Sequence, residues 1–165
     1  MVSTSGSRRS RPKLRPAGTL LALALLALAG CAGPKYRIEA PAAFKRFEES
    51  KDFRFITADG VMLKGREVDN YPKAKLPFWT DALRRHLEAR GYTFRDESCF
   101  ETTKGLDGCT LEFLLPWGAE DWAMGVTLFV AGKRIILLES AGPFDRYEAV
   151  QKALAAAYRT FEPGS

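Results

Sequence analysis

An unbroken run of Leu and Ala from Leu20 to Ala29 separates a short leader from the part of the chain that must fold. The leader, residues 1–16, carries five basic residues and no acidic one. A basic segment, a short apolar run and small residues before a cleavage site are typical of a secretory signal peptide. Ten helical residues span about 15 Å, half of a hydrocarbon core of about 30 Å, so a transmembrane helix is not expected. We therefore predict that residues 1–30 are a signal peptide.

The run ends in Leu28-Ala29-Gly30-Cys31, which resembles the lipobox of bacterial lipoproteins, where a small residue precedes an invariant cysteine. The resemblance implies that Cys31 becomes the N-terminus and is diacylated on its sulfur. Two or three acyl chains hold a domain on a membrane stably, whereas one chain binds only marginally. Ala32 stands where an Asp tends to retain lipoproteins in the inner membrane, which favours the outer membrane in a Gram-negative host. The alternatives are an ordinary signal peptide with an incidental cysteine and a buried Leu-rich helix.

Removal of the predicted signal changes the charge of the protein. Five of the 25 Lys and Arg residues precede Cys31 and none of the 20 Asp and Glu residues does, so the formal charge of +5 falls to zero. A nucleic-acid-binding domain carries a basic footprint, so we predict no nucleic-acid partner. The 135 remaining residues suit one domain with one core. We assign residues 31–43 to a lipidated N-terminus and tether, and residues 44–165 to a single domain.

Two cysteines remain if Cys31 carries lipid, and export to an oxidising compartment favours their pairing. Cys99 and Cys109 are both odd-numbered positions, and Lys104 lies midway between them. In a hairpin centred there, the two side chains would lie opposite each other on one face, at a spacing that a disulfide accepts. We therefore predict a structural disulfide, with two buried thiols as the alternative.

Apolar periodicity and turn residues predict a chain of short strands and two amphipathic helices. The helices are expected at residues 76–90, before a C-cap glycine at Gly91, and at residues 144–161, after Pro143. Residues 40–48 are predicted to form a short helical turn that docks Phe44 and Phe47, and Ala141-Gly142-Pro143 to end the sheet. The strands are expected at residues 53–57, 61–68, 92–100, 109–115, 122–130 and 133–139.

This order, two strands, a helix, four strands and a helix, predicts an α+β fold with a largely antiparallel sheet. It resembles the Mog1/PsbP-like fold, including small bacterial lipoproteins similar to DcrB. The resemblance is carried by residues 53–63 with their Ala58-Asp59-Gly60 turn, by Leu76-Pro77-Phe78-Trp79, and by residues 126–143. It implies an α/β/α sandwich in which about six strands are flanked by two main helices. Members of this fold are mostly binding, assembly or accessory proteins, and the resemblance implies no shared catalytic residues.

Candidate catalytic and metal-binding residues are few. His86 is the only histidine, and a hydrolase would need it as a base oriented by Asp81 or Asp121, but a surface histidine is the favoured interpretation. Asp107 with Glu120 and Asp121 offers carboxylates for Ca²⁺, yet no twelve-residue calcium loop is present, so solvated turns are favoured. We predict no metal and no cofactor.

The tryptophans are the remaining candidates for a contact surface. Trp79 is interpreted as a core residue, whereas Trp117 and Trp122 flank a loop that could present both to a ligand or partner. Packing of these two side chains against the sheet edge is the favoured alternative. We therefore expect a membrane-anchored, non-enzymatic lipoprotein domain that binds or supports another envelope protein. The competing hypotheses are a small-ligand carrier and an envelope hydrolase that uses His86 or a carboxylate pair.

Overall fold

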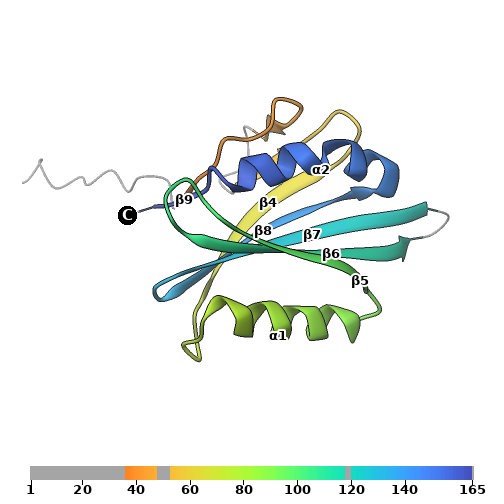
Figure 1. Ribbon diagram of the computed structural model, residues 1–165. Helices are drawn as coiled ribbons and strands as arrows, with labels where there is room; N and C mark the ends of the chain where they lie inside the picture. The colour runs from red at the N-terminus through yellow and green to blue at the C-terminus, as the bar shows by residue number, and fades with distance from the viewer. Residues whose placement is uncertain (1–35, 48–52, 118–119, 165) are drawn as a thin grey trace, which may run out of the picture. The chain divides into compact units, whose positions relative to one another are not determined.

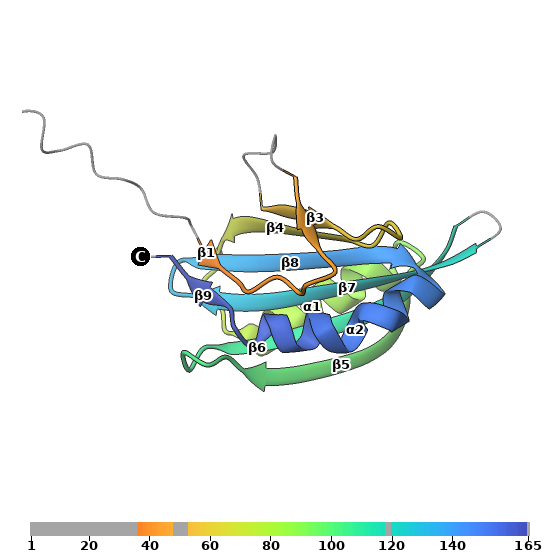
Figure 2. The same cartoon turned by 90° about the horizontal axis from the view of Figure 1, so that it is seen from above.

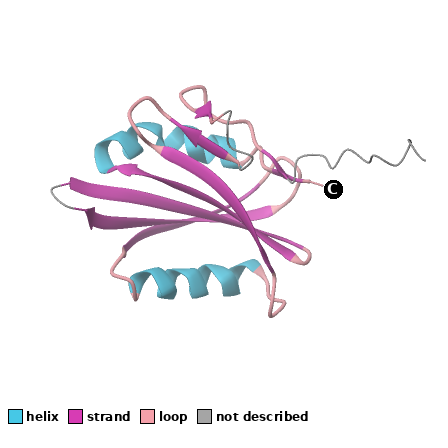
Figure 3. Cartoon of the chain, turned by 180° about the vertical axis from the view of Figure 1, so that it is seen from behind, coloured by secondary structure: helices cyan, strands magenta, loops and turns pink. Residues whose placement is uncertain are grey.

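The computed structural model describes residues 36–47, 53–117 and 120–164; Cys31 and the predicted signal peptide lie outside these ranges. A seven-stranded sheet in the order β2-β3-β4-β8-β7-β6-β5 forms the middle layer, and all its neighbouring strands pair antiparallel. Two helices cover opposite faces of this sheet, α1 (Leu76–Glu88) on one and α2 (Phe144–Tyr158) on the other (Figures 1 and 3). The strands of the large sheet are β2 (Lys45–Arg46), β3 (Arg54–Ile56), β4 (Met62–Asp69), β5 (Thr93–Glu101), β6 (Asp107–Trp117), β7 (Glu120–Ala131) and β8 (Arg134–Pro143).

The predicted α+β sandwich is confirmed, with one strand more in the large sheet than expected. Residues 40–48 were predicted to be helical, but Lys45 and Arg46 form β2, which pairs with β3. Phe44 is 5 % exposed, as its predicted docking requires, whereas Phe47 is exposed. The sheet also continues past Glu139, because β8 stays paired with β4 to Ala141 and with β7 to Pro143. The pairing with β7 therefore overrides the turn signal of Gly142 and Pro143.

Two hydrophobic cores lie on the two faces of the sheet. Along β8, Ile135 and Leu137 face α1 while Ile136 and Leu138 face α2, and all four side chains are buried. This continuous apolar run arises because the central strand is covered on both faces. Each such side chain contributes about 1.5–3 kcal/mol on burial. Phe129 on β7 and Phe161 after α2 stack with ring centroids 4.1 Å apart, and they close the core beneath α2.

The two ends of the described chain meet beside the large sheet. β1 (Tyr36–Arg37) and β9 (Glu162–Pro163) pair antiparallel as a separate two-stranded sheet (Figure 2). The ring of Tyr36 lies over Gly65, where a Cβ would collide with it, and packs against Phe53 at 5.2 Å between centroids. Residues 36–43, which the sequence interpretation assigned to the tether, therefore include side chains packed on the core beneath α2.

The loop between β4 and α1 is held by one buried amide. Asn70 is 7 % exposed, and its side chain makes four hydrogen bonds. Its Oδ1 accepts from the backbone N of Ala74 at 3.0 Å and from Nε1 of Trp79 at 2.8 Å. Its Nδ2 donates to the carbonyl oxygens of Ala74 and Gly132, each at 3.1 Å. All the bonding capacity of the amide is used, so the loop is fixed against α1 and the β7–β8 turn.

Within the described residues no helix is long and apolar enough to cross a membrane.

Candidate functional site

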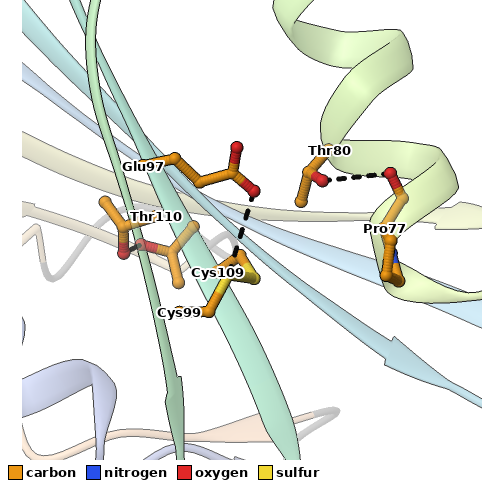
Figure 4. Close-up of a disulfide and its surroundings, with 7 residues drawn as sticks. Pro77, Thr80, Glu97, Cys99, Cys109 and Thr110 are labelled. Atoms are coloured by element: carbon orange, nitrogen blue, oxygen red, sulfur yellow. Dashed lines mark hydrogen bonds between the residues drawn. A yellow bond between two sulfur atoms is a disulfide. The ribbon is translucent and has the colours of Figure 1, made fainter.

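The β5–β6 hairpin presents a disulfide on one face and a cleft on the other. Cys99 and Cys109 are directly opposed in the register, with Cα atoms 4.0 Å apart and their sulfurs bonded. Figure 4 shows the disulfide on the side of the hairpin that faces Pro77 and Thr80 of α1. The turn runs from Thr102 to Leu106, whose backbone groups are joined by a 2.9 Å hydrogen bond, so Lys104 is at its centre as predicted. The predicted disulfide is confirmed.

The opposite face of the same hairpin forms one wall of the cleft, and α2 forms the other. The cleft has a volume of about 210 Å³, below the roughly 300–1,000 Å³ of small-molecule pockets. Its strand wall consists of Asp96, Ser98, Phe100, Thr110 and Glu112, and its helix wall of Tyr147, Gln151, Lys152, Leu154, Ala155, Tyr158 and Arg159. Both walls therefore offer polar and charged side chains beside apolar surface.

A chain of buried hydroxyl groups runs from the cleft into the sheet. The Oγ1 atoms of Thr110 and Thr127 are 2.7 Å apart, and Thr127 is hydrogen-bonded to Tyr158. Tyr158 donates to Ser140 Oγ at 3.0 Å, and Tyr147 Oη lies 3.1 Å from the same oxygen. Each hydroxyl has a single hydrogen, so the neighbours of a hydroxyl decide where that hydrogen points.

The orientation of the chain follows from its last member. Ser140 Oγ is 3.3 Å from the carbonyl oxygen of Gly125, which can only accept, so Ser140 donates its hydrogen there. Tyr158 and Tyr147 must then both donate to Ser140, and Thr127 donates to Tyr158. Ser140 is fully buried, with donors on two sides and no base beside it. A serine nucleophile needs an adjacent base, so this serine is a structural acceptor.

Burial also keeps the two tyrosines neutral. Desolvation raises the pKa of Tyr147 to about 12, and it raises the pKa of Tyr158 further. In both cases the nearby carboxylate of Glu112 adds a smaller effect in the same direction, because it disfavours a second negative charge. Both phenols therefore remain hydrogen-bond donors at physiological pH.

The rim of the cleft is charged and ordered by contacts across it. Gln151 Nε2 donates to Glu112 Oε1 at 2.5 Å, which joins α2 to β6. Arg95 of β5 reaches Glu148 of α2 at 3.7 Å and lies 4.9 Å from the ring centroid of Phe144. At the other end, the guanidinium of Arg159 lies 5.3 Å from the ring centroid of Phe100. These contacts hold α2 against the β5–β6 hairpin along its length.

The histidine and its proposed orienting acids are not brought together. His86 is exposed on α1, on the other side of the sheet from the cleft. Asp81 is engaged by two arginines, at 3.3 Å from Arg84 and 3.1 Å from Arg85. The hydrogen bond from Arg85 is the largest cause of the lowered pKa of Asp81. This carboxylate is therefore committed to its own helix.

The candidate calcium ligands lie at opposite ends of one hairpin. Asp107 begins β6, whereas Glu120 pairs with Trp117 at the far end of that strand. Ten residues of strand separate these ends by about 33 Å, so one ion cannot bridge them.

Trp122 is half-buried in β7 and pairs with Leu115 and Pro143, and the side chain of Trp117 lies outside the described part of the chain. Trp79 is half-buried and packs against the α1-side core, as predicted.

Sequence reasoning missed the hydroxyl chain. The amphipathic helix predicted at residues 144–161 accounts for the buried rings of Tyr147 and Tyr158, but it leaves their hydroxyls unexplained. A usable signal was present, because Thr127 lies inside an apolar stretch and Ser140 closely follows the apolar run that ends at Leu138. Buried polar groups need partners, so two helix tyrosines and two such strand hydroxyls predict one another.

The sequence matches no protein-family model and no curated protein. Solved structures nevertheless share the fold. LpqN of Mycobacterium tuberculosis, involved in cell envelope biogenesis, aligns with a TM-score of 0.60 at 10% identity over 84% of this chain and 88% of its own. The cyanobacterial PsbP of Synechocystis gives 0.54 at 13% identity, over 78% and 86%. The Ran-binding protein Mog1p of Saccharomyces cerevisiae gives 0.52 at 15% identity, over 81% and 92%. The fold is therefore Mog1/PsbP-like.

Proposed function

We propose that the mature chain is a lipid-anchored accessory domain of the cell envelope, which binds a protein partner and has no catalytic activity of its own. Acylated Cys31 is its anchor, on the periplasmic face of the outer membrane in a Gram-negative host. The Leu28–Cys31 motif supports the anchor. The fold supports the binding role, since LpqN is involved in cell envelope biogenesis and Mog1p binds Ran.

One observation carries the binding role: the cleft lies beside an open sheet edge. β5 is the terminal strand of the large sheet, and in the described residues it pairs only with β6. Such an edge presents backbone donors and acceptors to an extended segment of another chain. Asp96 and Ser98 project from this strand into the cleft, opposite Lys152 of α2. A partner segment lying along β5 would place alternate side chains between them.

The charges of β5 determine what binds there. Arg95, Asp96, Glu97 and Glu101 are all exposed on this strand, and charged side chains on an edge oppose pairing between identical copies. A register shift between Phe94 and Asp96 further interrupts the regular edge. The edge therefore favours a partner with a complementary charge pattern.

The two competing hypotheses find less support in the geometry. A small-ligand carrier needs a sizeable enclosed apolar cavity, whereas the cleft is small and carries charged side chains on both walls. A hydrolase needs a nucleophile or water beside a base, whereas Ser140 is surrounded by donors and His86 lies beyond the sheet. A His86→Ala variant that loses the cellular function while its level and fold are unchanged would favour the hydrolase.

The anchor is tested by labelling cells with radioactive palmitate. Wild-type protein should incorporate the label and fractionate with membranes, and Cys31→Ala should lose the label and accumulate unprocessed. A Cys31→Ala protein that still carries palmitate would refute the anchor.

The partner site is tested by placing a photo-crosslinking amino acid at Ser98, beside the cleft, and at Lys45, on the opposite edge strand β2. Irradiation of intact cells should give a discrete protein adduct from position 98 only. Lys152→Glu should reduce that adduct, with Lys45→Glu as the matched charge reversal. Equal adducts from positions 45 and 98, or none from 98 in repeated experiments, would contradict the proposal.

A further inference from the structure

One end of the sheet carries exposed aromatic and basic side chains that the partner site does not use. The loop between β4 and α1 presents Tyr71, which is 86 % exposed, and the first turn of α1 presents Phe78, which is 53 % exposed. Lys73 and Lys75 lie between them, and Lys133 in the β7–β8 turn lies beside Asn70, whose backbone N donates to its carbonyl at 2.8 Å. We name these five residues the aromatic–lysine tip.

The tip is held rigidly and is positively charged. The four side-chain hydrogen bonds of Asn70 fix the loop, and Phe78 packs edge-on against Trp79 with centroids 5.1 Å apart. None of the three lysines forms an ion pair with a carboxylate that the structure describes. Asp69, which precedes the loop, is already paired with Arg134 at 2.5 Å. The charge of the lysines is therefore available to an external anion.

The tip lies at the end of the sheet where the chain arrives from Cys31. In Figures 1 and 2, the β1–β9 pair, the β7–β8 turn and the end of β4 that leads into the loop are all at the same end of the strands. Tyr36 itself lies over Gly65 of β4, four residues before Asp69. The five peptide steps from Cys31 to Tyr36 can span at most about 18 Å, whatever their conformation. A lipid on Cys31 thus keeps this end of the sheet next to the bilayer.

We propose that the aromatic–lysine tip rests on the anionic headgroup layer of the membrane that anchors the protein; this inference depends on the lipid anchor proposed above. Tyrosine rings settle at the membrane interface because one end of the ring is apolar and the other is polar. Lysines near an anionic surface add electrostatic attraction. Contact at the tip and the short attachment through Tyr36 together fix the orientation of the sheet, with its strands running away from the bilayer.

A photo-crosslinker tests this contact in the full, processed lipoprotein. Benzoylphenylalanine replaces Tyr71 in one protein and Asp59 in the control, because Asp59 is exposed in the β3–β4 turn at the other end of β4. Each protein is reconstituted into vesicles of phosphatidylcholine with radiolabelled phosphatidylglycerol. We expect the lipid adduct from position 71 to exceed that from position 59 by at least about fivefold, the ratio that about 1 kcal/mol for a single lysine gives. Lys73→Glu should lower the adduct from position 71, and the matched Lys45→Glu should not.

The outcomes separate this inference from the proposed function. A protein that carries lipid on Cys31 but gives equal lipid adducts from positions 71 and 59 overturns the inference and leaves the anchor intact. A protein adduct, rather than a lipid adduct, from position 71 in whole cells overturns it as well, because the tip would then be a partner surface. A wild-type chain without palmitate overturns the anchor and, with it, the inference.

Discussion

Removal of one buried hydroxyl tests the role assigned to the hydroxyl chain. Tyr158→Phe keeps the ring, which is 2 % exposed, and deletes an oxygen that donates to Ser140 at 3.0 Å and is hydrogen-bonded to Thr127. Ser140 loses a donor and Thr127 loses an acceptor. A buried polar group left without its partner costs about 1–3 kcal/mol. Since Ser140 keeps its bonds to Tyr147 and Gly125, we expect the free energy of unfolding to fall by about 2 kcal/mol.

The matched control is Tyr71→Phe, the same chemical change at a side chain that is 86 % exposed. Surface changes of this kind stay within about 0.5 kcal/mol. Urea unfolding of the processed protein, followed by circular dichroism, should show a lower midpoint for Tyr158→Phe at an unchanged m-value. If both variants unfold within about 0.5 kcal/mol of each other, the hydroxyl chain contributes no net stability and the assigned orientation loses its energetic basis.

Three further predictions concern pH, the disulfide and the buried Asn70 side chain. The stability that neutral Tyr147 contributes is fully present below its unfolded pKa of about 10, and it is lost as the pH rises toward its folded pKa of about 12. Tyr147→Phe should therefore flatten the decline of the unfolding free energy at alkaline pH, measured by urea titration at each pH. The double variant Cys99→Ala with Cys109→Ala should lower the free energy of unfolding by roughly 2–3 kcal/mol, the value expected for a ten-residue loop, and an unchanged urea midpoint would contradict this. Asn70→Asp places a carboxylate against two carbonyl oxygens and should cost about 2–3 kcal/mol while changing the fluorescence of Trp79; unaltered emission would contradict the hydrogen-bond assignment.

The features predicted correctly from the sequence are those that depend on local chain geometry. The parity of Cys99 and Cys109 about Lys104 is sufficient to place a disulfide across a hairpin, because the side-chain period of a strand is two. The strand predicted at residues 133–139 is likewise found, as the first part of β8.

The features that were missed or wrong depend on contacts between distant parts of the chain. Lys45 and Arg46 became a strand because β3 offered an edge, and local propensity toward a helical turn could not compete with that pairing. The cleft depends on Tyr147 and Tyr158 meeting hydroxyls from β6, β7 and β8, which only the tertiary fold brings together. The tip was invisible for the same reason, since Lys133 reaches Asn70 across more than sixty residues of sequence.

The β1–β9 pair has a mechanical consequence. A pulling force that enters at Tyr36 is resisted by two residue pairs, Tyr36 with Pro163 and Arg37 with Glu162, and by the packing of the Tyr36 ring against Phe53. The seven-stranded sheet behind them is held by much longer ladders. Once detached, residues 36–43 can extend to about 27 Å in total before the β2–β3 pairing is loaded. The N-terminal segment would therefore detach before the ladders of the large sheet open, and it would protect the domain that it holds.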